Sequence, residues 1–194
     1  IASSLLSGST VERAILAGDG DAFGDYIGSN RVDPNVLGSP FSGVVSVSIR
    51  YNVGTPDIFG YICSGALIGD RHVLTAAHCI DQNDMGLPIT LSASDDVRVR
   101  FNHNNPDSLS PFVPAGATQI TASRVTMHKD YAGFNICADG SFGCLNDDLA
   151  IITLSQAAPA GAARYSIWGN ELQTGQVITM AGYGTSGNGL VGAV

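Results

Sequence analysis

Short apolar runs that alternate with polar residues, and that end at Gly, Asn, Asp or Pro, organise most of this sequence. Residues 45–49 read VSVSI, and residues 97–101 read VRVRF. Alternation with a period of two places every second side chain on the same face of a strand. The pattern predicts antiparallel strands from Phe41 onward, with Arg98 and Arg100 on a solvent-exposed face.

Further apolar runs occur at residues 62–68, 124–127, 149–154 and 177–181. Gly supplies 24 of the 194 residues and charged residues only 13%, so long, charge-laced helices are not expected. We therefore predict an all-β fold, a six-stranded antiparallel Greek-key barrel, because closing the sheet leaves no strand edge exposed.

Three segments differ from the predicted strands. Residues 1–31 are small and acidic in character and are interpreted as an N-terminal extension or propeptide. Residues 102–114 and 130–146 are rich in Asn, Asp, Gly and Pro, and are predicted to form long surface loops.

The charge excludes two classes of partner. The formal net charge is -8, which opposes binding to phosphate backbones and to anionic membranes. No apolar run approaches the roughly 20 residues that a membrane-spanning helix needs. We expect neither nucleic acid nor a membrane as a partner.

The cysteines indicate the compartment. Cys63, Cys79, Cys137 and Cys144 allow three connectivities, of which sequential pairing is the simplest. Closing the first loop would stabilise the fold by about 3 kcal/mol. An even cysteine count and a low lysine content favour an oxidising compartment. Four buried thiols and a zinc site remain as alternatives, although no Cys-x-x-Cys or His-x3-His pattern occurs.

One histidine lies where catalytic residues are often found. His78 follows the apolar pair at residues 73–74 and precedes a polar loop, so it is predicted to lie at the end of a strand. A histidine beside a cysteine is by itself compatible with a structural role. Cys63 on an upstream strand and Asp148 directly before an apolar run favour catalysis.

Five segments resemble the trypsin-like, chymotrypsin-fold serine endopeptidases over roughly residues 41–184. In the family's order they are CSGALI at 63–68, VLTAAHC at 73–79, HKDY at 128–131, DLAIITL at 148–154 and AGYG at 181–184. The resemblance implies two barrels, of which the second supplies the nucleophilic serine, the oxyanion hole and the specificity pocket. It assigns residues 32–184 to the first barrel region and 185–194 to the start of the inter-barrel connector.

The resemblance also implies roles for two residues and no cofactor. His78 would be the general base that takes the serine proton and returns it to the leaving amine. Asp148 would hold the imidazole in the correct tautomer and stabilise its cationic form. If the register were shifted by one residue, Asp147 would take this role.

The family's nucleophile motif, Gly-Asp-Ser-Gly-Gly, occurs nowhere in these 194 residues. Ser64, Ser141 and Ser186 lie in other contexts: a strand, a loop between cysteines and a Gly-rich turn. The chain alone is therefore expected to be inactive. The implied partners are a C-terminal barrel that carries the serine, as a separate chain or a missing segment, and a protein or peptide substrate. The alternative is a non-catalytic barrel that binds a protein.

Activation by cleavage is a second implication. Cleavage between Arg31 and Val32 would release residues 1–31 as a propeptide and make the protein a zymogen. The residues that follow, Val-Asp-Pro-Asn, depart from the family's Ile-Val-Gly-Gly. The expected location is secreted, either extracellular or periplasmic.

The other histidines and several acidic residues are expected to have no chemical role. His72 is predicted to pack, and His103 and His128 to be solvated or structural. No twelve-residue calcium loop is present, so four aspartates are interpreted as solvated charge and no metal is assigned: Asp81, Asp84, Asp95 and Asp96.

Overall fold

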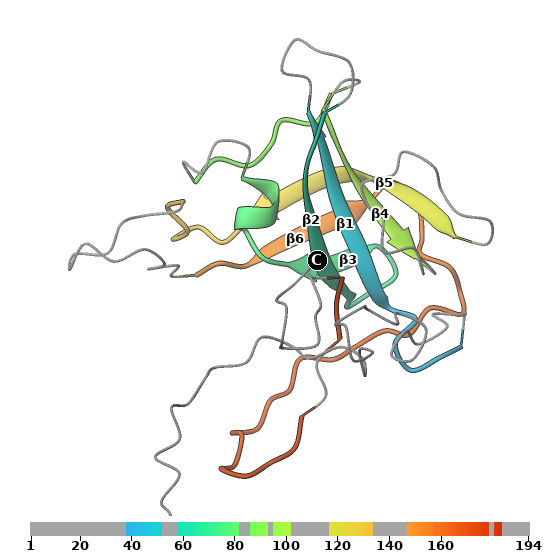
Figure 1. The fold of residues 1–194 in the computed structure, drawn as a ribbon, viewed down its shortest axis with the longest axis vertical. Coiled ribbons are helices and arrows are strands. Elements are labelled where there is room, and N and C mark those ends of the chain that lie inside the picture. Colours follow the sequence, from blue (N-terminus) through green and yellow to red (C-terminus); the bar gives the residue numbers. More distant parts are fainter. Residues whose placement is uncertain are drawn as a thin grey trace, which may run out of the picture. The chain divides into compact units, whose positions relative to one another are not determined.

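A computed structural model describes residues 38–51, 58–81, 86–92, 95–101, 117–133, 147–178 and 181–183 (Figure 1). Its strands are β1 (Val44–Tyr51), β2 (Ile58–Leu67), β3 (His72–Thr75), β4 (Asp96–Phe101), β5 (Thr118–Met127) and β6 (Ala150–Leu154). One 3-10 turn, η2 (His78–Ile80), follows β3. Across these ranges there is no α-helix, so none of the described segments forms a membrane-spanning helix.

The six strands close into a barrel in the order β1-β2-β3-β6-β5-β4, and every neighbouring pair is antiparallel. Figure 1 shows β1 and β2 side by side, with β5 and β6 crossing behind them. The predicted all-β, six-stranded antiparallel barrel is confirmed.

The core comes from the alternating residues of the strands. Val47 of β1 pairs with Val99 of β4, and Ile49 pairs with Val97. These four side chains are at most 1% exposed, as is Ile152 of β6. Burying a side chain of this size contributes about 1.5–3 kcal/mol each, so the apolar set of each strand determines which face turns inward.

The predicted solvent face of β4 is wrong. Arg100 is fully buried, and its Nε donates a hydrogen bond to Gln119 Oε1 at 3.0 Å. Arg98 is mostly covered, and its Nε lies 3.0 Å from Asp96 Oδ1. Burial lowers the pKa of Arg100, and the nearby charge of Arg98 lowers this pKa further. Alternation separates the two faces of a strand, but it does not show whether the polar face is covered.

Two of the four aspartates are not solvated charge. Asp81 is fully buried, and its Oδ2 accepts a hydrogen bond from the Gly86 amide at 2.7 Å. Asp96 forms ion pairs with Arg98 and with Arg50, the second at 2.8 Å. Both carboxylates therefore stabilise local structure: Asp81 a loop and Asp96 the polar side of β1 and β4.

The strand expected at residues 177–181 is not found where the structure describes it. Val177 and Ile178 are outside any strand and are 92% and 60% exposed, and Ala181 is also not in a strand. An isolated strand has no partner for its backbone hydrogen bonds, so an apolar run alone does not form one. The strand that completes the six-stranded barrel is instead β3, which is shorter than the other five.

Several predictions fall outside the described residues. These are the extension at 1–31, the cleavage at Arg31–Val32, the loop at 102–114, the pairing of Cys137 with Cys144, and the connector at 185–194. Of the loop at 130–146, the structure describes residues 130–133, which form a turn and a short irregular segment.

Candidate active site

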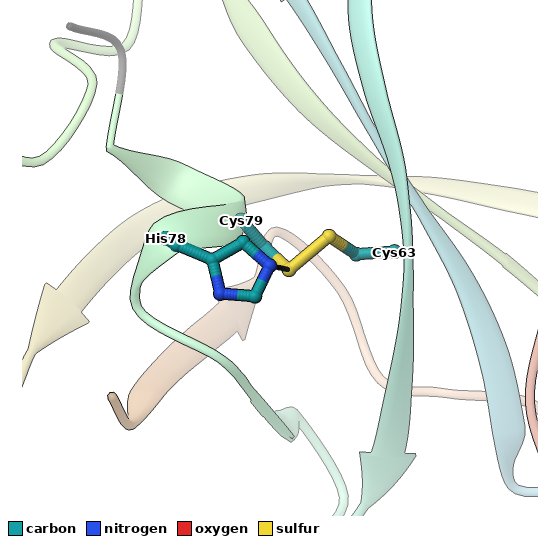
Figure 2. A group of neighbouring side chains, drawn as sticks. All are labelled: Cys63, His78 and Cys79. Atoms are coloured by element: carbon teal, nitrogen blue, oxygen red, sulfur yellow. Dashed lines mark hydrogen bonds between the residues drawn. A yellow bond between two sulfur atoms is a disulfide. The ribbon is translucent and has the colours of Figure 1, made fainter. Parts of the chain in front are cut away.

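The position of His78 follows from the end of β3 and from a disulfide. The β3–β6 ladder ends at the pair Thr75 and Ala150, and η2 turns the chain across the rim of the barrel directly afterwards. Cys79 in η2 is bonded to Cys63 of β2, with an S–S distance of 2.03 Å (Figure 2). The disulfide ties η2 to the neighbouring strand, so the backbone that carries His78 is anchored on both sides.

The position of Asp148 follows from the same ladder. Because Ala150 pairs with Thr75, the residues just before β6 lie beside those just after β3. A tight turn precedes β6, in which the Leu149 amide donates to the Asp147 carbonyl at 2.7 Å. Asp147 has φ 59°, in the left-handed region that few non-glycine residues adopt. This turn presents the Asp148 carboxylate to η2.

The Asp148 carboxylate contacts His78 through both oxygens. The His78 amide donates to Oδ1 at 2.8 Å, and His78 Nδ1 lies 2.7 Å from Oδ2. A carboxylate only accepts, so Nδ1 carries the proton and the neutral ring has its lone pair on Nε2. The side chains are 36% and 18% exposed, so the pair is half-shielded from water while the ring remains accessible.

The structure distinguishes between the two neighbouring aspartates. Asp148 is paired with His78, whereas the Asp147 carboxylate lies 3.7 Å from Nδ1 of His128. The two consecutive carboxylates therefore point to different histidines.

The disulfide lies beside the imidazole. His78 Nε2 is 3.5 Å from Cys79 Sγ, and Figure 2 shows the ring next to the sulfur pair. Cys63, His78 and Cys79 are close enough together to suggest a metal site. Because both sulfurs are in the disulfide, neither is available as a thiolate ligand. The free-thiol and zinc alternatives are wrong for Cys63 and Cys79.

Ser64 makes a structural hydrogen bond. Its Oγ accepts a hydrogen bond from the Tyr183 amide at 2.7 Å, and a Cβ added at Gly182 would lie 2.7 Å from the same oxygen. The segment 181–183 therefore rests on β2 beside the disulfide. The sequence predicts a strand at Ser64 but does not reveal this contact, because no local pattern links residues 119 positions apart.

The sequence also does not predict a second group of neighbouring side chains. His128, which was expected to be solvated or structural, lies close to Asp130 and to Asp147. The signal in the sequence is the HKDY segment at one end of a strand and the aspartate pair at the start of another. Only the antiparallel register of β5 and β6 brings the two together.

Comparisons with known proteins agree with this architecture. The family model described as Trypsin matches residues 31–191. Trypsin Tyr p 3.0101 of Tyrophagus putrescentiae is 31% identical over 129 residues, covering 66% of this chain and 39% of that protein. The inactive CLIP domain-containing serine protease A3 of Aedes aegypti is 33% identical over 110 residues, covering 57% of this chain and 19% of that protein. The phenoloxidase-activating enzyme of Bombyx mori is 30% identical over 107 residues, covering 50% and 22%.

The chain thus spans less than half the length of each of these relatives. The family match nevertheless includes the whole of the described barrel and both members of the His78–Asp148 pair. A closed antiparallel barrel, a disulfide that anchors η2 and a match over most of the chain lead to one assignment: the chain belongs to the trypsin family of serine proteases.

Proposed function

We propose that this chain is the N-terminal part of a secreted serine endopeptidase and contributes His78 and Asp148 to a Ser-His-Asp triad. The observation that carries the proposal is the contact of one carboxylate with both the amide and Nδ1 of His78. This arrangement orients the ring and sets its tautomer, which are two of the tasks of the acidic member of a triad.

The proposed reaction uses Nε2 of His78. This nitrogen takes the proton from the serine hydroxyl as the oxygen attacks the substrate carbonyl, and the ring becomes cationic. Asp148 stabilises that cation at Nδ1. Nε2 then gives the proton to the leaving amine, an acyl-enzyme remains, and water releases the second product through the same transfers.

The serine in this proposal belongs to a C-terminal barrel outside these 194 residues. Several large apolar side chains after β6 are exposed and support such a partner, since they would be buried if a second barrel packed against them. They are between 60% and 92% exposed: Ile167, Trp168, Leu172, Val177 and Ile178. The limited share of each relative that the chain covers is consistent with a further barrel.

The proposed location is extracellular or periplasmic, since the Cys63–Cys79 disulfide persists in oxidising compartments. The proposed zymogen is activated by cleavage between Arg31 and Val32, which makes residues 1–31 a propeptide. N-terminal sequencing of the mature protein tests this part. A mature, active form that begins upstream of Arg31 would refute it.

A second function is a non-catalytic barrel that binds a protein partner. The Aedes aegypti relative supports this alternative, because it is named as inactive although it is similar over 110 residues. Similarity to the family over this part of the chain therefore does not by itself distinguish the two functions.

Labelling with a fluorophosphonate probe decides between them. The native protein that contains this chain is treated with the probe and separated under reducing and non-reducing conditions. In the proposed protease, a second polypeptide or a C-terminal extension takes the label, and His78→Ala abolishes labelling while His72→Ala does not. Absence of label from a correctly folded protein that has been cleaved between Arg31 and Val32 would favour the binding module.

A further inference from the structure

A second group of potential ligands lies next to the Asp148 turn. It consists of His128 and Asp130, which follow β5, and Asp147, which precedes β6. Pairing of Met127 with Ala150 and donation from the His128 amide to the Leu149 carbonyl at 2.8 Å hold these segments together. The group is separate from His78, to which Asp148 is bound.

The three potential donor atoms lie close together. His128 Nδ1 lies 3.7 Å from Asp147 Oδ1 and 4.0 Å from Asp130 Oδ2, and the three atoms are all within 4.8 Å of one another. The Asp130 amide donates to Nδ1 from 3.3 Å, so this nitrogen is an acceptor, and a metal ion would take the place of this long hydrogen bond at its lone pair. A neutral imidazole nitrogen with an available lone pair is the form that binds metals.

These separations are close to those of a metal site. Two donors bound to zinc at about 2.1 Å in tetrahedral geometry lie about 3.4 Å apart. The two aspartate side chains are 45% and 54% exposed, so they can rotate by the small amount required without disturbing the core. Water can occupy the remaining position on this open side.

We propose that His128, Asp130 and Asp147 form a binding site for a first-row divalent transition metal, with Zn²⁺ as the representative ion. One imidazole nitrogen and two carboxylate oxygens suit zinc and its neighbours, whereas Ca²⁺ is bound by oxygen ligands alone. The ion would bridge the end of β5 to the turn that carries Asp148.

Lys129 provides an internal check on this proposal. Its Nζ lies 2.5 Å from Asp130 Oδ2, the same oxygen that would bind the metal. The lysine therefore competes with the ion for one ligand. Replacing it with alanine should tighten metal binding, which is the opposite of what loss of a ligand would do.

The test is a titration of the 194-residue chain with Zn²⁺ by isothermal calorimetry, with circular dichroism as the check on folding. We expect one equivalent to bind at the site, at least tenfold weaker binding in His128→Ala and in Asp147→Asn, and tighter binding in Lys129→Ala. Asp147→Asn keeps the shape of the side chain and serves if His128→Ala fails to fold. His72, which the sequence predicts to pack, is exposed at the start of β3, and His72→Ala is the matched control.

Three results would overturn the proposal. The first is no binding to the folded wild-type chain. The second is binding that survives both His128→Ala and Asp147→Asn. The third is binding that is lost in His72→Ala, His78→Ala or His103→Ala but kept in His128→Ala, which would place the ion at another histidine. None of these results depends on proteolytic activity, so failure here leaves the proposed function untouched.

Discussion

Asp148 binds His78 at two different atoms, the backbone amide at 2.8 Å and the ring Nδ1 at 2.7 Å. The first contact positions η2 relative to β6, and the second orients the ring. The carboxylate accepts both hydrogen bonds, and both join residues 70 positions apart in the sequence. The same side chain therefore links the fold of the barrel rim to the orientation of the candidate base.

Replacing Asp148 with asparagine should abolish most of the activity of the complete enzyme. An amide can donate to Nδ1 and so favours the wrong tautomer, which in triads of this kind lowers kcat by about 10⁴-fold. Steady-state kinetics on the full-length protein measures the effect. Asp147→Asn is the matched control and should leave kcat within a fewfold of wild type. Equal losses in the two variants, or no loss in Asp148→Asn, would contradict the assignment.

Removing the Cys63–Cys79 disulfide should destabilise the barrel. Its cysteines are 16 positions apart, and closing a loop of this length contributes about 3 kcal/mol in the chain-entropy estimate. Urea unfolding of a Cys63→Ala/Cys79→Ala variant measures the change in the free energy of unfolding. An unchanged denaturation midpoint would mean that the disulfide only positions η2 and adds nothing to global stability.

Gly182→Ala should destabilise the contact between segment 181–183 and β2. The new Cβ would lie 2.7 Å from Ser64 Oγ, which is too close for two unbonded atoms. Ser64→Ala alone should cost about 1 kcal/mol, since it removes the acceptor of the Tyr183 amide. In the double variant the clash with the hydroxyl is gone, so its cost should be smaller than the sum of the two single costs. Additive costs in thermal unfolding would show that the two positions do not interact.

The buried Arg100 leads to a prediction in which a second substitution restores stability lost in the first. Gln119→Leu should destabilise the barrel by about 1–3 kcal/mol, because it removes the acceptor of Arg100 Nε in a buried site. Adding Arg100→Met should restore most of that stability, since replacing a buried charge with an apolar side chain of similar length is often neutral or stabilising. Chemical denaturation of the two variants tests whether the double variant is the more stable one. A double variant that is less stable than Gln119→Leu would refute it.

Much of the barrel could be predicted from local patterns. The alternation in residues 45–49 and 97–101 marks strands because side-chain direction along a strand depends on the residue's own backbone. The residue types of the four-residue β3, HVLT, do not alternate between apolar and polar, although the burial of its side chains does. The apolar run at 177–181 predicts a strand, but its described residues form none. Apolar residues form a strand only when another strand is present to pair with them.

The candidate site was predictable in its residue types and less so in its connections. The positions of His78 and Asp148 at the ends of apolar runs could be read from the sequence, and their pairing was implied by family resemblance. Which of two consecutive aspartates binds His78 depended on the turn before β6, where Asp147 takes φ 59°. A difference of one residue in that turn would exchange the two carboxylates.

By itself, the sequence determined most of the strand pattern, the family resemblance and the candidate site residues, because these depend on residue type and spacing. The tertiary structure decided that Arg100 is buried, that Ser64 receives the Tyr183 amide, and that His128 meets Asp147. Each of these depends on strand register, which brings together side chains that no local pattern relates. Burial and hydrogen bonding are properties of the whole barrel, and they assign to polar residues roles that their neighbours in the sequence do not reveal.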